Sequence, residues 1–230
     1  MQPRLCKRLA GLLLGLALAG SASAQDLAID LSANLGFTTN YVFRGIEQNS
    51  GEPSGFFGLD AEAAGFYAGT WATNVDTGLE YDLYGGYIFE AGPFSIGGGY
   101  TGFFYTDEDF SDTIHEGNIY ASYTPTESVS INLEQTFGVI DGDDGDDDNY
   151  SFTAVSIEWI GFGVLYGFFG DDLDGDYIEA YYVTPIAEDI VEGVDVGIHL
   201  VASSEDLLET VGESESDEYI LFTLTKTFDL

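Results

Sequence analysis

The chain has 230 residues, of which 41 are acidic and 5 are basic, and its formal net charge is −36. Charge of this sign and size disfavours binding to nucleic acid or to any anionic surface, while 45% hydrophobic and 15% aromatic residues exclude a disordered acidic chain. The length is that of one domain, and no Pro- or Ser-rich linker divides it.

Residues 1–24 have the pattern of a secretory signal peptide. Three basic residues precede the apolar run LAGLLLGLALAG, and the small residues SASA follow before Gln25. The run is too short to span a membrane as a helix. We expect cleavage after Ala24, which leaves residues 25–230 as a single exported domain that contains no cysteine and therefore no disulfide.

The exported part alternates between apolar and polar residues with a period of two, which predicts β-strands. Within 127–139, for example, the odd positions are apolar except Gln135, and the even positions are polar. About twelve segments follow this pattern, each near the ~9–11 residues that a strand needs to cross a membrane obliquely. They are 29–44, 54–63, 65–74, 80–90, 93–105, 114–124, 127–139, 149–160, 161–169, 176–184, 193–203 and 218–228.

The connections between these segments alternate in length and charge. After even-numbered segments most are short, such as AAG, EAGP, TPTE and IGFG, although TPIAEDIVEG at 184–193 is longer. After odd-numbered segments they are longer or strongly acidic, such as TDEDFSD and IDGDDGDDDN. Short periplasmic turns and longer external loops are typical of outer-membrane barrels, so we expect the longer or strongly acidic connections that follow odd-numbered segments to lie outside the cell.

A membrane barrel turns its apolar residues to lipid, whereas a soluble β-sandwich buries them, and alternation alone does not separate the two. Aromatic residues near strand ends on the apolar face favour the barrel, because Tyr and Trp suit the lipid–water interface. These residues are Tyr41, Phe43, Tyr67, Trp71, Tyr100, Phe104, Trp159 and Phe228. The sequence therefore predicts an all-β, transmembrane, up-and-down antiparallel barrel, with an acidic sandwich as the less favoured fold.

The stretches TTNYVFRGIEQN, GFYAGTWATNVD and EYDLYGGYIFEAG resemble the TorF-type porin family of bacterial outer-membrane proteins. The resemblance is dense over residues 30–105. After residue 105 it consists only of the shared alternation of apolar and polar residues, except that the closing stretch TLTKTF is also similar. It implies a porin-like role and an outer-membrane location, and it supplies no catalytic residues.

If the apolar positions face lipid, alternation turns a set of charged residues toward the interior. They are Asp30, Arg44, Asp60, Glu62, Asp82, Glu116, Glu134, Glu158 and Asp195, and His199 joins them. Carboxylates along a narrow aqueous path concentrate cations, so these residues predict a small pore for cationic or neutral solutes. The alternative is a plugged lumen in which they only hydrogen-bond. Arg44 is expected to pair with one or two of the acids and to organise the first external loop.

Two acidic loops are candidates for weak binding of divalent cations at the surface, but neither matches the EF-hand pattern. The candidate ligands are Asp143, Asp146, Asp148, Asp172, Asp174 and Asp176. No other cofactor is expected, since the chain has neither a phosphate-binding glycine loop nor a Cys/His cluster.

Catalysis is not expected. Asp195, His199 and Ser203 share one strand face, but neighbours in that series are ~13 Å apart, too far for a triad. We therefore predict a porin-like channel whose partners are outer-membrane lipid and small solutes, and the sequence does not specify an oligomeric state. The alternative is a non-conducting surface barrel whose acidic loops bind divalent cations or a partner.

Overall fold

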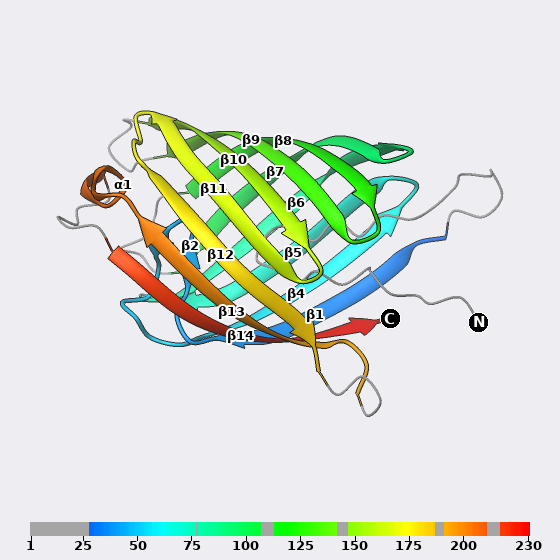
Figure 1. The fold of residues 1–230 in the computed structure, drawn as a ribbon. Coiled ribbons are helices and arrows are strands. Elements are labelled where there is room, and N and C mark those ends of the chain that lie inside the picture. The colour runs from blue at the N-terminus through cyan, green and yellow to red at the C-terminus, as the bar shows by residue number, and fades with distance from the viewer. Residues whose placement is uncertain (1–27, 77, 107–112, 142–146, 187–190, 211–216) are drawn as a thin grey trace.

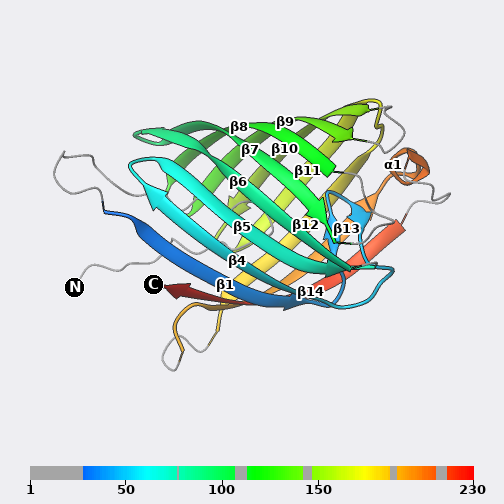
Figure 2. The same ribbon diagram turned by 180° about the vertical axis from the view of Figure 1, so that it is seen from behind.

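The structure, a computed structural model, describes residues 28–76, 78–106, 113–141, 147–186, 191–210 and 217–230. These residues form a closed antiparallel barrel of twelve strands, a two-stranded hairpin and one short helix (Figures 1 and 2). The barrel strands are β1 (Asp30–Thr38), β4 (Ser54–Ala63), β5 (Phe66–Val75), β6 (Gly78–Ala91), β7 (Phe94–Tyr105), β8 (Thr113–Thr126), β9 (Val129–Asp141), β10 (Asp148–Trp159), β11 (Phe162–Asp171), β12 (Asp176–Pro185), β13 (Val194–Ser203) and β14 (Asp217–Asp229).

Each barrel strand pairs with its neighbours along the chain, and β1 closes the ring by pairing with β14. The hairpin consists of β2 (Val42–Phe43) and β3 (Ile46–Glu47), and α1 covers Glu205–Thr210. Among the described residues, no helix is both long and apolar enough to cross a membrane.

The outer surface of the barrel is apolar. At alternate positions large hydrophobic side chains are exposed, for example Ile220 (62% exposed) and Trp159 (58%). Exposed apolar bands of this extent mark a surface that contacts lipid. The soluble sandwich is thereby excluded, and the predicted membrane barrel is confirmed.

Aromatic pairs mark one boundary of this apolar band. Beside the short turns, the rings of Phe66 and Tyr87 lie 4.7 Å apart between centroids, and those of Phe162 and Tyr182 lie 4.3 Å apart. Such girdles are typical of the lipid–water interface. Gln135, the exception to the alternation, is accommodated because its amide nitrogen donates to Phe152 O at 3.2 Å within the wall.

The short turns lie at the end where the chain terminates, and α1 lies at the opposite end (Figure 1). Two of them are two-residue turns with positive φ at both positions, Ala64–Gly65 and Ile160–Gly161. This type I′ geometry matches the right-handed twist of paired strands.

The first predicted segment, 29–44, is wrong in its second half. β1 ends at Thr38, and the next residues leave the wall and enter the hairpin. Four aromatic residues that were predicted to face lipid lie inside the barrel instead, two of them on this segment and two on β5. Tyr41 and Phe43 belong to the segment that carries the hairpin, Trp71 packs on Tyr41, and the Tyr67 hydroxyl extends over glycines of β6 and β7. In contrast, Tyr100 and Trp159 are on the outer face as predicted.

Many inward glycines make room for aromatic rings. A Cβ at Gly138 would overlap the ring of Tyr150, and one at Gly163 would overlap the ring of Tyr181. The glycine-rich strands thus allow large rings to lie flat against the inner wall.

Candidate functional site

The external half of the lumen is crossed by the segment between β1 and β4, which carries the β2–β3 hairpin. The hairpin turns at Arg44 (φ 48°) and Gly45 (φ 84°), the same two-residue geometry that the periplasmic turns use. The hairpin projects into the barrel (Figures 1 and 2), as its contacts with β9 and β13 on other parts of the wall show.

The base of the hairpin is held by Tyr41 and Asn49. The Tyr41 hydroxyl donates to Glu80 Oε1 at 2.7 Å, and its backbone N–H donates to Asn49 Oδ1 at 3.1 Å. Burial, together with the carboxylates of Glu80 and Asp82, raises the pKa of Tyr41 well above its ordinary value. The phenol therefore stays protonated and remains a hydrogen-bond donor.

The tip is held by Arg44. Its guanidinium hydrogen-bonds both oxygens of Glu116 on β8, one of them at 3.1 Å, and donates to Glu134 Oε1 on β9 at 2.8 Å. The same group lies 4.2 Å from the ring centroid of Phe152 and 4.8 Å from that of Phe43. Bidentate pairing with cation–π contact is a strong arrangement for arginine, and the expected pairing of Arg44 with two acids is confirmed.

Gly45 seats the tip against the opposite wall. Its carbonyl accepts a hydrogen bond of 2.6 Å from Ser203 Oγ on β13. A Cβ at this position would lie 2.8 Å from Tyr177 Cβ and 2.9 Å from Ser203 Oγ. Only glycine fits both this contact and the positive φ.

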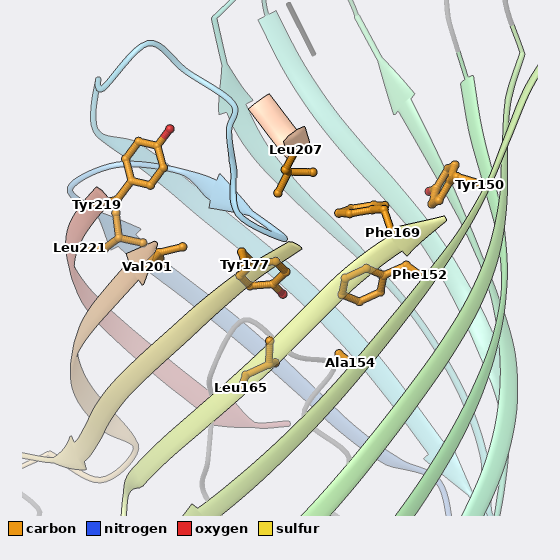
Figure 3. Close-up of a cluster of buried hydrophobic side chains, with 10 residues drawn as sticks. All are labelled: Tyr150, Phe152, Ala154, Leu165, Phe169, Tyr177, Val201, Leu207, Tyr219 and Leu221. Atoms are coloured by element: carbon orange, nitrogen blue, oxygen red, sulfur yellow. The ribbon is translucent and has the colours of Figure 1, made fainter. Parts of the chain in front are cut away.

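A cluster of buried apolar side chains occupies the inner wall beside the hairpin. It brings residues of β10 to β14 together with Leu207 of α1, and Val42 and Ile46 of the hairpin pack against it (Figure 3). Its members are Tyr150, Phe152, Ala154, Leu165, Phe169, Tyr177, Val201, Leu207, Tyr219 and Leu221. The hairpin and the cluster together fill a large part of the external half of the lumen.

The structure places the predicted interior acids on the inward face of the strands, but it does not gather them in one place. Glu116 and Glu134 meet at Arg44, and Arg44 itself lies on the hairpin and not on a barrel strand. Glu158 on β10 accepts a hydrogen bond of 2.7 Å from the hydroxyl of Tyr181 on β12. The tyrosine side chain therefore extends over the inner face of β11.

The remaining predicted acids lie on β1, β4, β6 and β13. Asp60 accepts hydrogen bonds from Tyr84 and, at 3.4 Å, from Asn34. Asp30 and Glu62 are direct cross-strand partners. Asp82 and Asp195 are buried on the inward faces of β6 and β13. That all of these residues line a conducting pore stays a prediction.

Sequence reasoning missed two interior acids, Glu80 and Glu179. Alternation could have found both, since Glu80 lies two residues before Asp82 on the same face of β6, and Glu179 is the direct partner of the buried Val201 on β13. Glu179 accepts a hydrogen bond from His199 Nδ1 at 2.7 Å, and His199 Nε2 lies 3.4 Å from Thr223 Oγ1. His199 is thus oriented across strands.

The candidate metal ligands are dispersed where they are described. Asp172 accepts the backbone N–H of Asn149 at 2.9 Å, and Asp174 accepts that of Gly175 at 2.8 Å. Asp143 and Asp146 lie outside the described residues. Among the residues that are described, no group of three or more His, Cys, Asp or Glu is placed to hold a metal ion, and weak cation binding in these loops stays a prediction.

Lys226 is on the outer face near the periplasmic end. Its ammonium donates to Thr227 O at 2.8 Å and lies 4.6 Å from the centroid of the Phe228 ring. This is the snorkelling geometry expected of lysine at a membrane interface.

The barrel is similar to solved porin structures. For a KdgM porin in complex with disordered oligogalacturonate the TM-score is 0.57 at 7% identity, covering 87% of this chain and 99% of that chain. For the NanC porin the TM-score is 0.55 at 10% identity, covering 87% of this chain and 100% of that chain. At these identities the likeness concerns the fold, which is that of a porin. The apolar exterior and this fold place the barrel in the outer membrane.

Sequence comparison identifies a family without assigning it a function. No curated protein matches the chain. The matching family is described only as of unknown function, so the resemblance to the TorF-type porins stays a prediction. Because the match extends over residues 21–228, the chain belongs to the family of the bacterial protein of unknown function called Gcw_chp.

Proposed function

We propose that the protein is an outer-membrane channel for passive diffusion of small solutes, preferentially cationic or neutral ones. The observation that carries the proposal is the charge of the interior. Arg44 is already neutralised by Glu116 and Glu134, while Asp60 and Glu62 have no basic partner among the described residues. Carboxylates along an aqueous path attract cations and repel anions.

In this proposal the β2–β3 hairpin forms the constriction. Its tip reaches from the connection between β1 and β4 to β8, β9 and β13, so solutes would pass beside it and not through an unobstructed tube. Selection by size would come from the hairpin, and selection by charge from the acids that Arg44 does not neutralise.

The test is the reversal potential of the refolded protein in a planar bilayer under a potassium chloride gradient. We expect a cation-selective current, and we expect the double variant Asp60→Asn, Glu62→Gln to shift the reversal potential toward zero. Glu134 is a poor position for this test, because a change there also releases Arg44. Unchanged selectivity in the double variant would refute the proposed role of these acids.

A second candidate is a non-conducting surface barrel whose acidic external loops bind divalent cations or a partner. It is favoured by the close packing of the external half of the lumen, where Phe152 and Leu207 are each 1% exposed and Glu116 is 2% exposed. Absence of current from protein shown to be folded and inserted would support this candidate and exclude the channel.

Two further proposals accompany either function. Residues 1–24 would be a signal peptide removed on export, leaving residues 25–230 as the barrel domain.

Weak divalent-cation binding by Asp148, Asp172, Asp174 and Asp176 would be measured by calcium titration of the refolded barrel.

A further inference from the structure

Two buried carboxylates in the external half of the lumen have no basic partner among the described residues. Glu80 is 2% exposed and Asp82 is 8% exposed. They are two residues apart on the inward face of β6, which separates their Cα atoms by about 7 Å. Arg44, the basic residue of the hairpin, is engaged by Glu116 and Glu134.

Asp82 is flanked by aromatic side chains. Its direct partner on β5 is Trp71 and its direct partner on β7 is Phe103, and all three point into the lumen. Directly opposed side chains have Cβ atoms about 5 Å apart, so the carboxylate lies between an indole and a phenyl ring.

The hairpin segment covers this pair of rings. Tyr41 packs on Trp71 and Phe43 packs on Phe103, each with a centroid distance of 5.7 Å. We call this group of neighbouring side chains the aromatic–acid chamber, and it comprises Tyr41, Phe43, Trp71, Glu80, Asp82 and Phe103.

The hydrogen bonds in the chamber satisfy Glu80, to which Tyr105 also donates, but not Asp82. Tyr41 donates to Glu80 Oε1, but Asp82 Oδ1 is buried and has no hydrogen-bond partner among the described residues. A buried carboxylate oxygen without a hydrogen-bond partner is unfavourable. A cation between Glu80 and Asp82 would remove this cost.

We propose that the aromatic–acid chamber binds one monovalent cation of the size and hydration of K⁺ or ammonium. The carboxylates supply the charge, and the faces of the surrounding rings add cation–π attraction. Since no group of three or more acidic or His ligands is assembled in the described part of the chain, the attraction would come from two carboxylates and ring faces, which suit a weakly hydrated monovalent ion better than Mg²⁺, an ion that gives up its water reluctantly. The site deepens the proposed cation pathway, but binding itself does not require an open channel.

Tryptophan fluorescence provides a direct measurement. The chain has two tryptophans, Trp71 in the chamber and Trp159 on the outer face. In the Trp159→Phe variant of the refolded barrel, the emission comes from Trp71 alone. We would titrate potassium chloride against N-methylglucamine chloride at constant ionic strength, and we expect a saturable change in this emission.

Asp82→Asn and Glu80→Gln, each made in the Trp159→Phe background, should each weaken the apparent affinity about tenfold or more. Glu90→Gln is the matched control, since it makes the same change on the same strand at an exposed position and should leave the affinity unchanged. Heat-modifiable migration in gels would verify that each variant is folded.

A response that does not saturate would overturn the proposal, as would equal responses in Asp82→Asn and Glu90→Gln. So would an emission that follows pH and not potassium, because Asp82 would then be neutralised by a proton. Potassium binding without any bilayer current would refute the channel and leave the site intact, so the two proposals fail separately.

Discussion

At the scale of single residues, Arg44 at the hairpin tip is expected to contribute strongly to stability, because it is a buried cation paired with two carboxylates. It is 10% exposed and pairs with Glu116, which is 2% exposed. Removing one partner of a buried ion pair leaves the other charge uncompensated, and this costs more than the pair itself contributes.

We therefore expect Arg44→Gln to lower the free energy of unfolding by about 3–5 kcal/mol, measured by urea titration of the refolded barrel. Lys226→Gln is the control, because Lys226 is the only other Lys or Arg after position 24 and, among the described residues, its ammonium donates to backbone carbonyls and not to a carboxylate. That change should cost about 1 kcal/mol or less. Equal losses in the two variants would contradict the assigned role of Arg44.

At the scale of elements, the strands could be predicted from the sequence and the hairpin could not. Period-two alternation is enforced wherever one face meets lipid and the other meets the lumen, so the predicted segments and the observed strands agree closely. Segment 127–139, for example, corresponds to β9 at Val129–Asp141.

The prediction failed at the end of β1 for a physical reason. Tyr41 and Phe43 continue the apolar alternation past Thr38, and alternation does not reveal whether an aromatic ring packs against lipid or against other rings inside the lumen. The dipeptide Arg44–Gly45 carried a turn signal, because glycine there permits positive φ. The partners of Arg44 depend on strands 72 and 90 residues away, which local pattern cannot identify.

Seating of the hairpin can be tested at Gly45. Gly45→Ala adds backbone strain at φ 84° and places Cβ 2.8 Å from Tyr177 Cβ. Gly92→Ala is a matched control, since Gly92 also has positive φ (62°) but its added Cβ meets nothing within 4 Å. Both changes should cost about 1 kcal/mol of strain.

Only Gly45→Ala should also unseat the tip, and in the proposed channel this would raise the single-channel conductance in planar bilayers. The same conductance in both alanine variants would mean that the hairpin is not the constriction.

At the scale of the whole molecule, the barrel has an apolar exterior, unlike a soluble protein, but apolar side chains also pack inside it. Lipid covers the outside, while the apolar cluster of β10 to β14 and α1 packs the inside next to acids. Burial inside thus depends on the hairpin and α1, two elements that the strand pattern does not specify. The strand pattern therefore predicts the barrel, but it does not predict how much of the lumen is open, because that depends on the hairpin and α1.

The hairpin also joins parts of the chain that are far apart in sequence, and this bears on when it can form. The bond from Ser203 to Gly45 spans 158 residues, and contacts of such separation form late because loop closure is costly. We expect Ser203→Ala to accelerate unfolding in urea while leaving the refolding rate nearly unchanged, as for interactions absent from the transition state. A slowed refolding rate would place this contact early.

The order of events during biogenesis follows from the same bond. Because β13 is the penultimate strand of the chain, the bond from Ser203 becomes available to the hairpin tip only after the strands that carry Glu116 and Glu134. We therefore expect the hairpin to be seated in two stages during biogenesis, first on β8 and β9 through Arg44 and then on β13 through Gly45.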